Sequence, residues 1–273
     1  MKKRHYKKHL GQHFLRDQAS IERILAVIQP NASDHFLELG AGDGALSKAL
    51  LDSGAKLTAI ELDPRWVQRL NNKYTQYIEA GTCRIIAGDM MQQDWAQLLG
   101  TQPNFRARLT GNLPYNISAI ILARTMNNLF GWSDAHFLIQ TEMAQRLTAK
   151  CGQPDWGRLA VLAHATVKAQ SAIGVPPEAF DPPPKVQSTL VRIEPEPQTT
   201  IHPELQPFIV QVARTIFSSR RKSLGNSLKT LFDRSELLHI GLNLELSADK
   251  TSFADICTVA CLLQDKDPKL LPA

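Results

Sequence analysis

Apolar residues recur with two different periods over about the first half of the chain. Residues 17–29 are predicted to form a helix, one face of which carries Ile21, Ile24 and Ile28. Short apolar runs typical of strands then alternate with stretches that have helical spacing. The pattern predicts strands at 35–39, 56–60, 84–87, 106–110 and 136–140, and helices at 45–51, 64–77, 117–129 and 142–148. Such alternation is typical of an α/β fold in which βαβ units build a parallel sheet.

The pattern changes after residue 150. It predicts a helix at 157–166 and two strands, at 168–175 and 186–193, separated by a Pro-rich turn. Glu194-Pro195-Glu196-Pro197 has the composition of a linker. Helical spacing then returns at 204–217, 221–231, 234–240 and 253–265. We therefore predict an arm over residues 1–16, a Rossmann-like α/β domain over 17–198, and a small all-helical C-terminal domain over 199–273.

The positive charge of the chain is unevenly distributed. The formal net charge is +5, from 31 Lys+Arg and 26 Asp+Glu. Residues 1–16 hold six basic residues and no acid, so without them 25 basic residues face 26 acidic ones and the remainder nets −1. A second acid-free stretch, 205–232, contains Arg220, Arg221 and Lys222. Two basic segments on a balanced protein favour a polyanionic partner, with a solvated surface as the alternative.

Several other classes of protein are disfavoured. No apolar run reaches the ~20 residues that span a membrane, and no apolar signal segment follows the basic N-terminus. The four cysteines include no Cys-x-x-Cys pair, a pattern that favours free thiols in a reducing compartment. His5, His9 and His13 recur at every fourth residue without a nearby acid. We therefore predict no metal site and assign these histidines to the basic arm.

A glycine-rich segment, residues 38–44, joins the first strand of the alternating region to a helix. Its glycines, Gly40 among them, allow the backbone to approach a ligand at the N-terminus of that helix. Glu61 ends the next strand, where a carboxylate can accept both hydroxyls of a ribose. Asp89 follows the third strand, where it can accept a hydrogen bond from an adenine amine. These features predict a site for an adenosine-containing cofactor, either NAD or S-adenosylmethionine.

The tetrapeptide Asn112-Leu113-Pro114-Tyr115 separates these two cofactors. It follows a strand-like run, and ligands of open α/β sheets bind at the carboxyl ends of strands. The Asn112 amide oxygen and the Leu113 carbonyl can accept hydrogen bonds from an exocyclic amine, while the Tyr115 ring can stack on a flat base. Hydride transfer has no use for this grip, whereas methyl transfer to the poorly nucleophilic amine of adenine does. The tetrapeptide therefore favours a methyltransferase that acts on adenine.

Five motifs occur together and in order along the chain. They are Gly-Gln-His-Phe-Leu at 11–15, the glycine-rich segment, Asn-Leu-Pro-Tyr-Asn-Ile-Ser at 112–118, Phe-Asp-Pro-Pro-Pro-Lys-Val at 180–186 and Arg-Arg-Lys at 220–222. In these motifs the chain resembles the KsgA-type small-subunit rRNA adenine dimethyltransferases, whose relatives include the erythromycin-resistance methylases. The resemblance covers nearly all of the chain.

The resemblance implies S-adenosylmethionine as the methyl donor and two transfers onto each of two adjacent adenines near the 3′ end of small-subunit rRNA. Catalytic roles are implied for Asn112, Leu113, Tyr115 and Phe180, with Phe180 facing Tyr115 across a flipped adenine. Cofactor contacts are implied at His13, Leu15, Gly40, Glu61, Asp89 and Asn112. One position departs from the family, because His13 stands where the family usually has Asn.

The expected substrate is rRNA within the small ribosomal subunit or its precursor, bound with the help of Arg220, Arg221 and Lys222. The protein is then expected to be a cytoplasmic monomer that does not contact a membrane. Two alternatives stay open at this point. One is a methyltransferase acting on another nucleic acid, such as large-subunit rRNA or DNA, and the other is an assembly factor whose catalysis is secondary.

Overall fold

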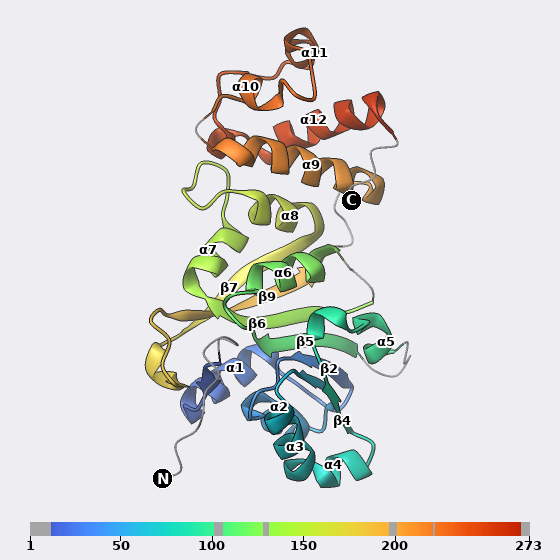
Figure 1. The fold of residues 1–273 in the computed structure, drawn as a ribbon, viewed down its shortest axis with the longest axis vertical. Coiled ribbons are helices and arrows are strands. Elements are labelled where there is room, and N and C mark those ends of the chain that lie inside the picture. The colour runs from blue at the N-terminus through green and yellow to red at the C-terminus, as the bar shows by residue number, and fades with distance from the viewer. Residues whose placement is uncertain (1–11, 101–105, 128–130, 197–200, 221, 269–273) are drawn as a thin grey trace. The chain divides into compact units, whose positions relative to one another are not determined.

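A computed structural model describes residues 12–100, 106–127, 131–196, 201–220 and 222–268 of the chain (Figure 1). The chain divides into two compact units. Unit 1 comprises the chain up to Ala144 together with Ala169–Pro195, and unit 2 comprises Gln145–Lys168 and the chain from Glu196 onward. The predicted boundary near residue 198 lies close to Pro195, but the segment Gln145–Lys168 groups with the C-terminal helices. The physical reason is hydrophobic packing, because Ala160 and Val161 of this segment are buried in the core of unit 2.

Unit 1 is built on one sheet with the strand order β4-β3-β2-β5-β6-β9-β7. Neighbouring strands from β4 to β6 are parallel, and β9 is antiparallel to β6. The parallel sheet expected from the alternating pattern is present from β4 to β6, and β9 extends it as an antiparallel strand. The strands are β2 (Asp34–Leu39), β3 (Lys56–Glu61), β4 (Cys83–Ala87), β5 (Arg106–Asn112), β6 (Asp134–Gln140), β7 (Val167–Val175) and β9 (Ser188–Pro195).

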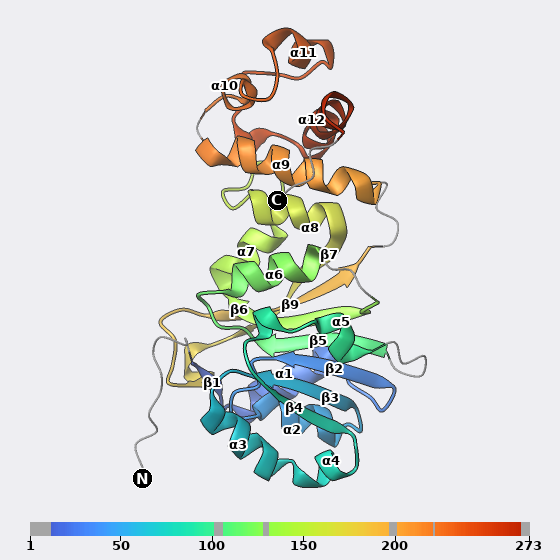
Figure 2. The same ribbon diagram turned by 45° about the vertical axis from the view of Figure 1, so that its right-hand side comes forward.

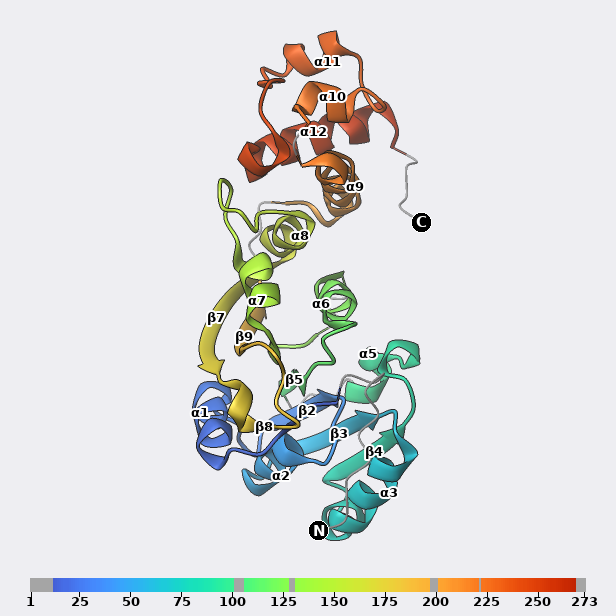
Figure 3. The same cartoon turned by 60° about the vertical axis from the view of Figure 1, so that its left-hand side comes forward.

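Helices lie on both faces of this sheet, with α1 and α2 on one side and α5 and α6 on the other (Figure 3). Strand β2 is buried on both faces, and its Phe36, Leu37 and Leu39 side chains are fully buried. The helices between the strands are α1 (Gln18–Ile28), α2 (Ala45–Asp52), α3 (Pro64–Lys73), α4 (Thr75–Glu79), α5 (Trp95–Leu99), α6 (Ser118–Asn127) and α7 (Thr141–Thr148).

Local chemistry explains where two helices differ from the predicted ranges. The helix expected at 64–77 is broken at Tyr74, whose buried hydroxyl donates to the Gly44 carbonyl at 2.6 Å and so ties the break to the glycine-rich segment. The short helix α5 was not predicted, since it offers only one turn of helical spacing. It begins at an Asp94 cap whose carboxylate accepts from the Gln97 amide.

The strand order reverses at β2. From β2 the chain continues outward to β3 and β4 on one side, and it later returns to β5 and β6 on the other. The carboxyl ends of β2, β3 and β5 therefore meet at one edge of the sheet, where a crevice forms in doubly wound folds. Close approach matters here: a Cβ on Gly111 of β5 would lie 2.5 Å from the Leu39 carbonyl oxygen, so only glycine fits.

The N-terminal segment forms part of unit 1 from residue 12 onward. Strand β1 (Phe14–Leu15) pairs antiparallel with β8 (Phe180–Asp181), and the Arg16 amide donates to the Ala179 carbonyl at 2.7 Å. Two segments far apart in the sequence are thereby joined. The predicted arm over 1–16 thus has a structured end, while residues 1–11 lie outside the described residues.

Unit 2 is helical. Helix α9 (Gln206–Ile216) packs against α8 (Arg158–Thr166) and α12 (Phe253–Lys266), and the short helices α10 (Leu224–Leu228) and α11 (Arg234–His239) complete it (Figure 2). Its core includes Trp156, whose indole donates to the Thr251 carbonyl at 3.0 Å. Among the described residues, no helix of either unit is long and apolar enough to cross a membrane.

Candidate active site

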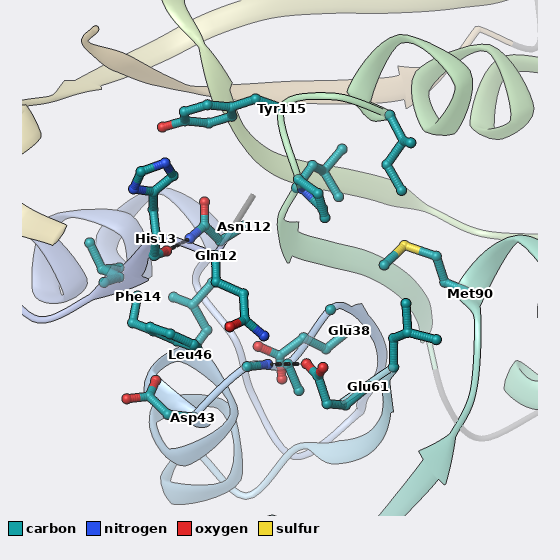
Figure 4. Close-up of a pocket in the computed structure, with 18 of the residues that line it drawn as sticks. Gln12, His13, Phe14, Glu38, Asp43, Leu46, Glu61, Met90, Asn112 and Tyr115 are labelled. Carbon is teal, nitrogen blue, oxygen red and sulfur yellow. Dashed lines mark hydrogen bonds between the residues drawn. The ribbon is translucent and has the colours of Figure 1, made fainter. Parts of the chain in front are cut away.

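A cavity of about 300 Å³ lies at the sheet edge where β2, β3 and β5 end (Figure 4). Five segments of unit 1 line it: residues 12–15, 38–46, 61–62, 89–91 and 112–117. The cavity therefore collects the glycine-rich segment, both predicted strand-end acids and the Asn112 tetrapeptide at one place. The two-stranded pairing of β1 with β8 adds the residues around His13, which sequence spacing does not bring near the others.

The glycine-rich segment forms a tight turn between β2 and α2. Gly40 and Gly42 have φ values of 78° and 58°, which favour glycine. A Cβ on Gly42 would approach the Phe14 ring to 3.0 Å, so the turn packs directly under the N-terminal segment. Arg16 forms an ion pair with Asp43 of the same turn. Arg16, which we assigned to the basic arm from the sequence, thus helps to hold the glycine turn in place.

Glu61 holds the glycine turn from below. One carboxylate oxygen accepts from the Gly42 amide at 2.7 Å and the other from the Asp63 amide at 2.8 Å. The side chain is buried, and burial raises the pKa of its carboxyl group. Glu61 also lines the cavity, where its carboxylate can accept further hydrogen bonds. Glu61 therefore lies at the end of β3 on the cavity wall and also supports the turn.

Glu38 is a second buried acid in the cavity. It accepts from the Ser47 hydroxyl at 2.5 Å. The pKa of Glu38 is raised to about 8, chiefly because the group is buried; the Ser47 hydrogen bond lowers the pKa and the negative charge of Glu61 raises it. The group favours a proton in the free protein, and a cation beside it would favour its ionised form.

Asp89 lines the cavity just after β4. Its Oδ1 accepts from the Met91 amide at 2.8 Å and so begins the short helical turn Met90–Gln92. The other carboxylate oxygen is available to a ligand, since one oxygen suffices for this cap. Met90 and Met91 continue the wall, and neither was singled out from the sequence.

Asn112 is oriented by a hydrogen bond across the cavity. Its Nδ2 donates to the backbone carbonyl of His13 at 2.7 Å. Because the amide group is planar, this contact turns the Oδ1 acceptor away from that carbonyl, toward the rings of His13 and Tyr115 (Figure 4). Leu113 follows with its side chain buried and its amide bonded to the Leu138 carbonyl at 3.0 Å. The tetrapeptide thus presents an acceptor to the cavity.

Two aromatic rings, those of His13 and Tyr115, lie beside the Asn112 amide oxygen (Figure 4). The His13 and Tyr115 rings are stacked, with centroids 5.4 Å apart and planes inclined at 24°. The Tyr115 hydroxyl bonds Ser188 Oγ at 2.7 Å, and His13 Nδ1 bonds the Pro182 carbonyl at 2.7 Å. A carbonyl only accepts, so Nδ1 carries a proton.

The Phe180 side chain is buried in a hydrophobic cluster and is not part of the cavity wall. It pairs with Leu15 in the β1–β8 ribbon, is 3% exposed and belongs to a hydrophobic cluster of unit 1. The ring beside Tyr115 is that of His13, and Phe180 does not line the cavity. Leu15 and Gly40 both line it.

The basic cluster lies in unit 2. The Arg220 guanidinium donates to the carbonyls of Pro154 and Trp156, at 2.5 and 2.7 Å, while Lys222 is exposed. Arg221 lies outside the described residues. Within the described residues, no cluster of three or more His, Cys, Asp or Glu side chains could hold a metal ion.

The fold belongs to the Rossmann-like methyltransferase class. The structure superimposes on a dimethyladenosine transferase from Plasmodium falciparum with a TM-score of 0.78, at 21% identity, over 94% of this chain and 98% of that one. It superimposes on the 23S rRNA methyltransferase ErmE with a TM-score of 0.69, at 22% identity, over 92% and 99% of the two chains.

Sequence comparisons narrow this class. Residues 3–265 match the family described as ribosomal RNA adenine dimethylase. Proteins called ribosomal RNA small subunit methyltransferase A are similar along nearly their whole length: one from Pseudomonas syringae is 36% identical over 95% of both chains, and one from Xylella fastidiosa is 37% identical over 93% and 94%.

The chain therefore belongs to the ribosomal RNA adenine dimethylase family. It is an S-adenosylmethionine-dependent methyltransferase that forms dimethyladenosine in ribosomal RNA. The family resemblance, the fold class and the cofactor predicted from the sequence are confirmed. The residues of the cavity suit that cofactor, since buried carboxylates lie beside the glycine turn, glycine at position 40 lets the backbone come close, and Asp89 adds a further acid to the wall.

Proposed function

We propose that this protein dimethylates two adjacent adenines near the 3′ end of small-subunit rRNA, within the small ribosomal subunit or its precursor. The relatives named for the small subunit support this choice of substrate. The orientation of the Asn112 amide carries the proposed chemistry, because it presents an oxygen acceptor to the cavity while the amide nitrogen is held by His13.

The grip on the target adenine follows from two acceptors. The exocyclic amine of adenine donates to Asn112 Oδ1 and to the Leu113 carbonyl, so its nitrogen lone pair is turned out of conjugation and becomes a better nucleophile. S-adenosylmethionine, when bound, supplies an electrophilic methyl group. The hydrogen bond to His13 orients the Asn112 amide before the target adenine binds. The protein therefore contributes positioning and fixed dipoles and does not need a strongly basic side chain.

Aromatic rings hold the base in plane. Tyr115 is the proposed stacking face, and its hydroxyl is anchored by Ser188. Phe180 is the proposed second face, by resemblance to the family. Since its side chain is buried in a hydrophobic cluster, that role requires the ring to turn toward the base when RNA binds. The His13 ring already lies beside Tyr115, so an adenine that stacks on Tyr115 would also contact His13.

The cofactor is held by residues on three sides of the cavity. We assign the ribose to Glu61, the adenine to Asp89, and the approach of the backbone to Gly40. Leu15, His13 and Asn112 close the side nearest the target base. The location of all six residues on the cavity wall supports this assignment.

RNA is bound outside the cavity by basic segments. Arg220, Arg221 and Lys222 are assigned to rRNA phosphates, and the exposure of Lys222 supports this. Unit 1 would carry catalysis, and unit 2, which includes the expected helical domain over 199–273, would carry RNA contacts. The protein would act as a monomer in the cytoplasm, where its ribosomal substrate is assembled.

Mass spectrometry of rRNA from cells with and without this protein tests the proposed function. We expect two adjacent dimethyladenosines near the 3′ end of small-subunit rRNA to disappear without the protein and to return on complementation. Disappearance of methylation from large-subunit rRNA instead would contradict the proposal. Complementation with Asn112→Ala separates catalysis from assembly: restored assembly without methylation would mean that binding to the particle is the main role.

A further inference from the structure

The wall of the cavity after β4 is a short segment with little regular structure of its own. Residues 89–91 line the cavity, and the helical turn Met90–Gln92 is only three residues long. A turn of this length leaves most of its carbonyls without partners in the same element. The position of Asp89 relative to the rest of the cavity therefore depends on contacts from outside the segment.

Arg124 of α6 supplies these contacts. Its Nη1 donates to the Met91 carbonyl at 2.6 Å and to the Met90 carbonyl at 3.2 Å, and its Nη2 donates to the Gln93 carbonyl at 2.5 Å. The planar guanidinium fork is suited to several acceptors in fixed directions. The Arg124 side chain thus binds three backbone carbonyls within residues 90–93.

A tryptophan holds the guanidinium in place. The Arg124 Cζ lies 4.3 Å from the centroid of the Trp95 ring, a cation–π contact, and Trp95 is almost fully buried. The Trp95 indole in turn donates to the Met90 carbonyl at 2.8 Å. Two side chains therefore converge on the backbone directly behind Asp89.

The same helix also borders the base-facing side of the cavity. Helix α6 begins at Ser118, immediately after the lining residues 112–117, and Ser118 Oγ donates to the Tyr115 carbonyl at 3.2 Å. Further along, the same helix carries Arg124. A rigid element thus connects the tetrapeptide loop with the wall at Asp89.

We propose that Arg124 is a positioning residue for cofactor binding: it fixes the Asp89–Met91 wall of the cavity by gathering the carbonyls of Met90, Met91 and Gln93. This inference rests on the proposed assignment of Asp89 to the cofactor. Arg124 does not line the cavity, so it acts through the wall.

Calorimetric titration of S-adenosylmethionine into purified Arg124→Met and Arg124→Lys variants tests the proposal. Arg124→Met keeps an apolar stem over Trp95 but removes all three hydrogen bonds, so we expect the affinity to fall about tenfold. Arg124→Lys keeps the charge without the fork and is expected to bind more tightly than Arg124→Met. With saturating cofactor, the kcat of methyl transfer should stay within about twofold of wild type, so the defect appears in KM for the cofactor.

Arg23→Met is the matched control, since Arg23 is an exposed arginine that donates to the Gly174 carbonyl. A fall in Tm with unchanged cofactor affinity in both Arg124 variants would overturn the proposal and leave Arg124 a structural residue. Asp89→Ala, titrated in parallel, separates the two claims. If it also binds the cofactor normally, the assignment of Asp89 fails; if it alone binds weakly, only the role of Arg124 fails.

Discussion

The Asn112 side-chain amide donates to the His13 backbone carbonyl at 2.7 Å, across 99 positions of sequence. The contact fixes which end of the amide faces the cavity. It also couples the tetrapeptide loop after β5 to the N-terminal segment, which is itself tied to β8 through Leu15 and Phe180. Three distant segments therefore depend on one another to form the base-binding side of the site.

This relationship predicts different results for two substitutions of Asn112. Asn112→Ala removes both the acceptor and the donor to the His13 carbonyl, and we expect single-turnover methyl transfer to slow by ~100- to 1000-fold while the fold stays intact. Asn112→Asp retains an acceptor but places a carboxylate against the His13 carbonyl, so it should be as slow and should also displace the N-terminal segment. Activity of either variant within tenfold of wild type would contradict the proposed grip on the amine.

Tyr115 should act through its ring more than through its hydroxyl. Tyr115→Phe removes the hydrogen bond to Ser188 but keeps the stacking face, so we expect activity to fall by at most about tenfold. Tyr115→Ala removes stacking worth ~1–3 kcal/mol per base and should cost more. Ser188→Ala is the matched control and should resemble Tyr115→Phe. Equal decreases for the Phe and Ala variants would argue against a stacked base.

Glu61 should govern cofactor affinity. Glu61→Gln leaves an NH₂ group facing either the Gly42 or the Asp63 amide, so one anchor of the glycine turn is removed together with a ribose contact. We expect S-adenosylmethionine binding to weaken by ~1.5–3 kcal/mol in calorimetry, while RNA binding stays nearly unchanged. The exposed Glu79→Gln serves as the control. Unchanged cofactor affinity in Glu61→Gln would remove Glu61 from the site.

Glu38 predicts a pH dependence of stability. Its pKa is raised by burial to about 8, from 4.5 as the ordinary value, so between these pH values the folded state binds more protons than the unfolded state. The free energy of unfolding should therefore fall as pH rises through this window, by at most ~1.4 kcal/mol per pH unit from this group. The raised pKa of Glu61 acts in the same direction.

The Glu38→Gln variant isolates this contribution. Its amide oxygen can still accept from Ser47, but the group no longer titrates. Denaturant unfolding of the apo protein between about pH 5 and pH 8 should give a shallower decline than in wild type. Parallel declines in the two proteins would show that Glu38 does not titrate in this range.

Neutralising Arg220, Arg221 and Lys222 should weaken binding to the ribosomal particle and flatten its salt dependence. The slope of log affinity against log salt should fall by about one for each rRNA phosphate that the variant no longer neutralises. Arg220 also bonds two carbonyls of unit 2, so Lys222→Ala is the cleaner single variant. Arg69→Ala and Arg84→Ala, at exposed positions of unit 1, are controls. An unchanged slope would place the RNA-binding surface elsewhere.

The elements that carry a long apolar pattern could be predicted from the sequence, and those defined by tertiary contacts could not. Strands β2 and β3 are such elements, because apolar residues that are fully buried, such as Leu37 and Ile60, mark them in the sequence. Strand β1 has only two residues and exists because it pairs with β8, which lies far along the chain. Likewise, the helix at Arg158–Thr166 belongs to unit 2 because of what it packs against, which spacing does not reveal.

The site follows the same division. Strand-end acids and glycines predicted Gly40, Glu61, Asp89 and Asn112, because parallel strands bring their carboxyl ends together. The stacking of His13 on Tyr115 and the grip of Arg124 on the wall depend on side-chain geometry alone. No periodicity or motif encodes these contacts, so only the folded structure shows them.

Methyl transfer by the purified protein tests directly whether it dimethylates adenine in small-subunit rRNA. Small ribosomal subunits from cells lacking the protein, and large subunits in equal amount, are incubated with methyl-labelled S-adenosylmethionine, and their nucleosides are identified by mass spectrometry. We expect label in N6,N6-dimethyladenosine from small-subunit rRNA, and almost none with Asn112→Ala. Label in large-subunit rRNA or in a nucleoside other than adenosine, or undiminished labelling by Asn112→Ala, would contradict this expectation.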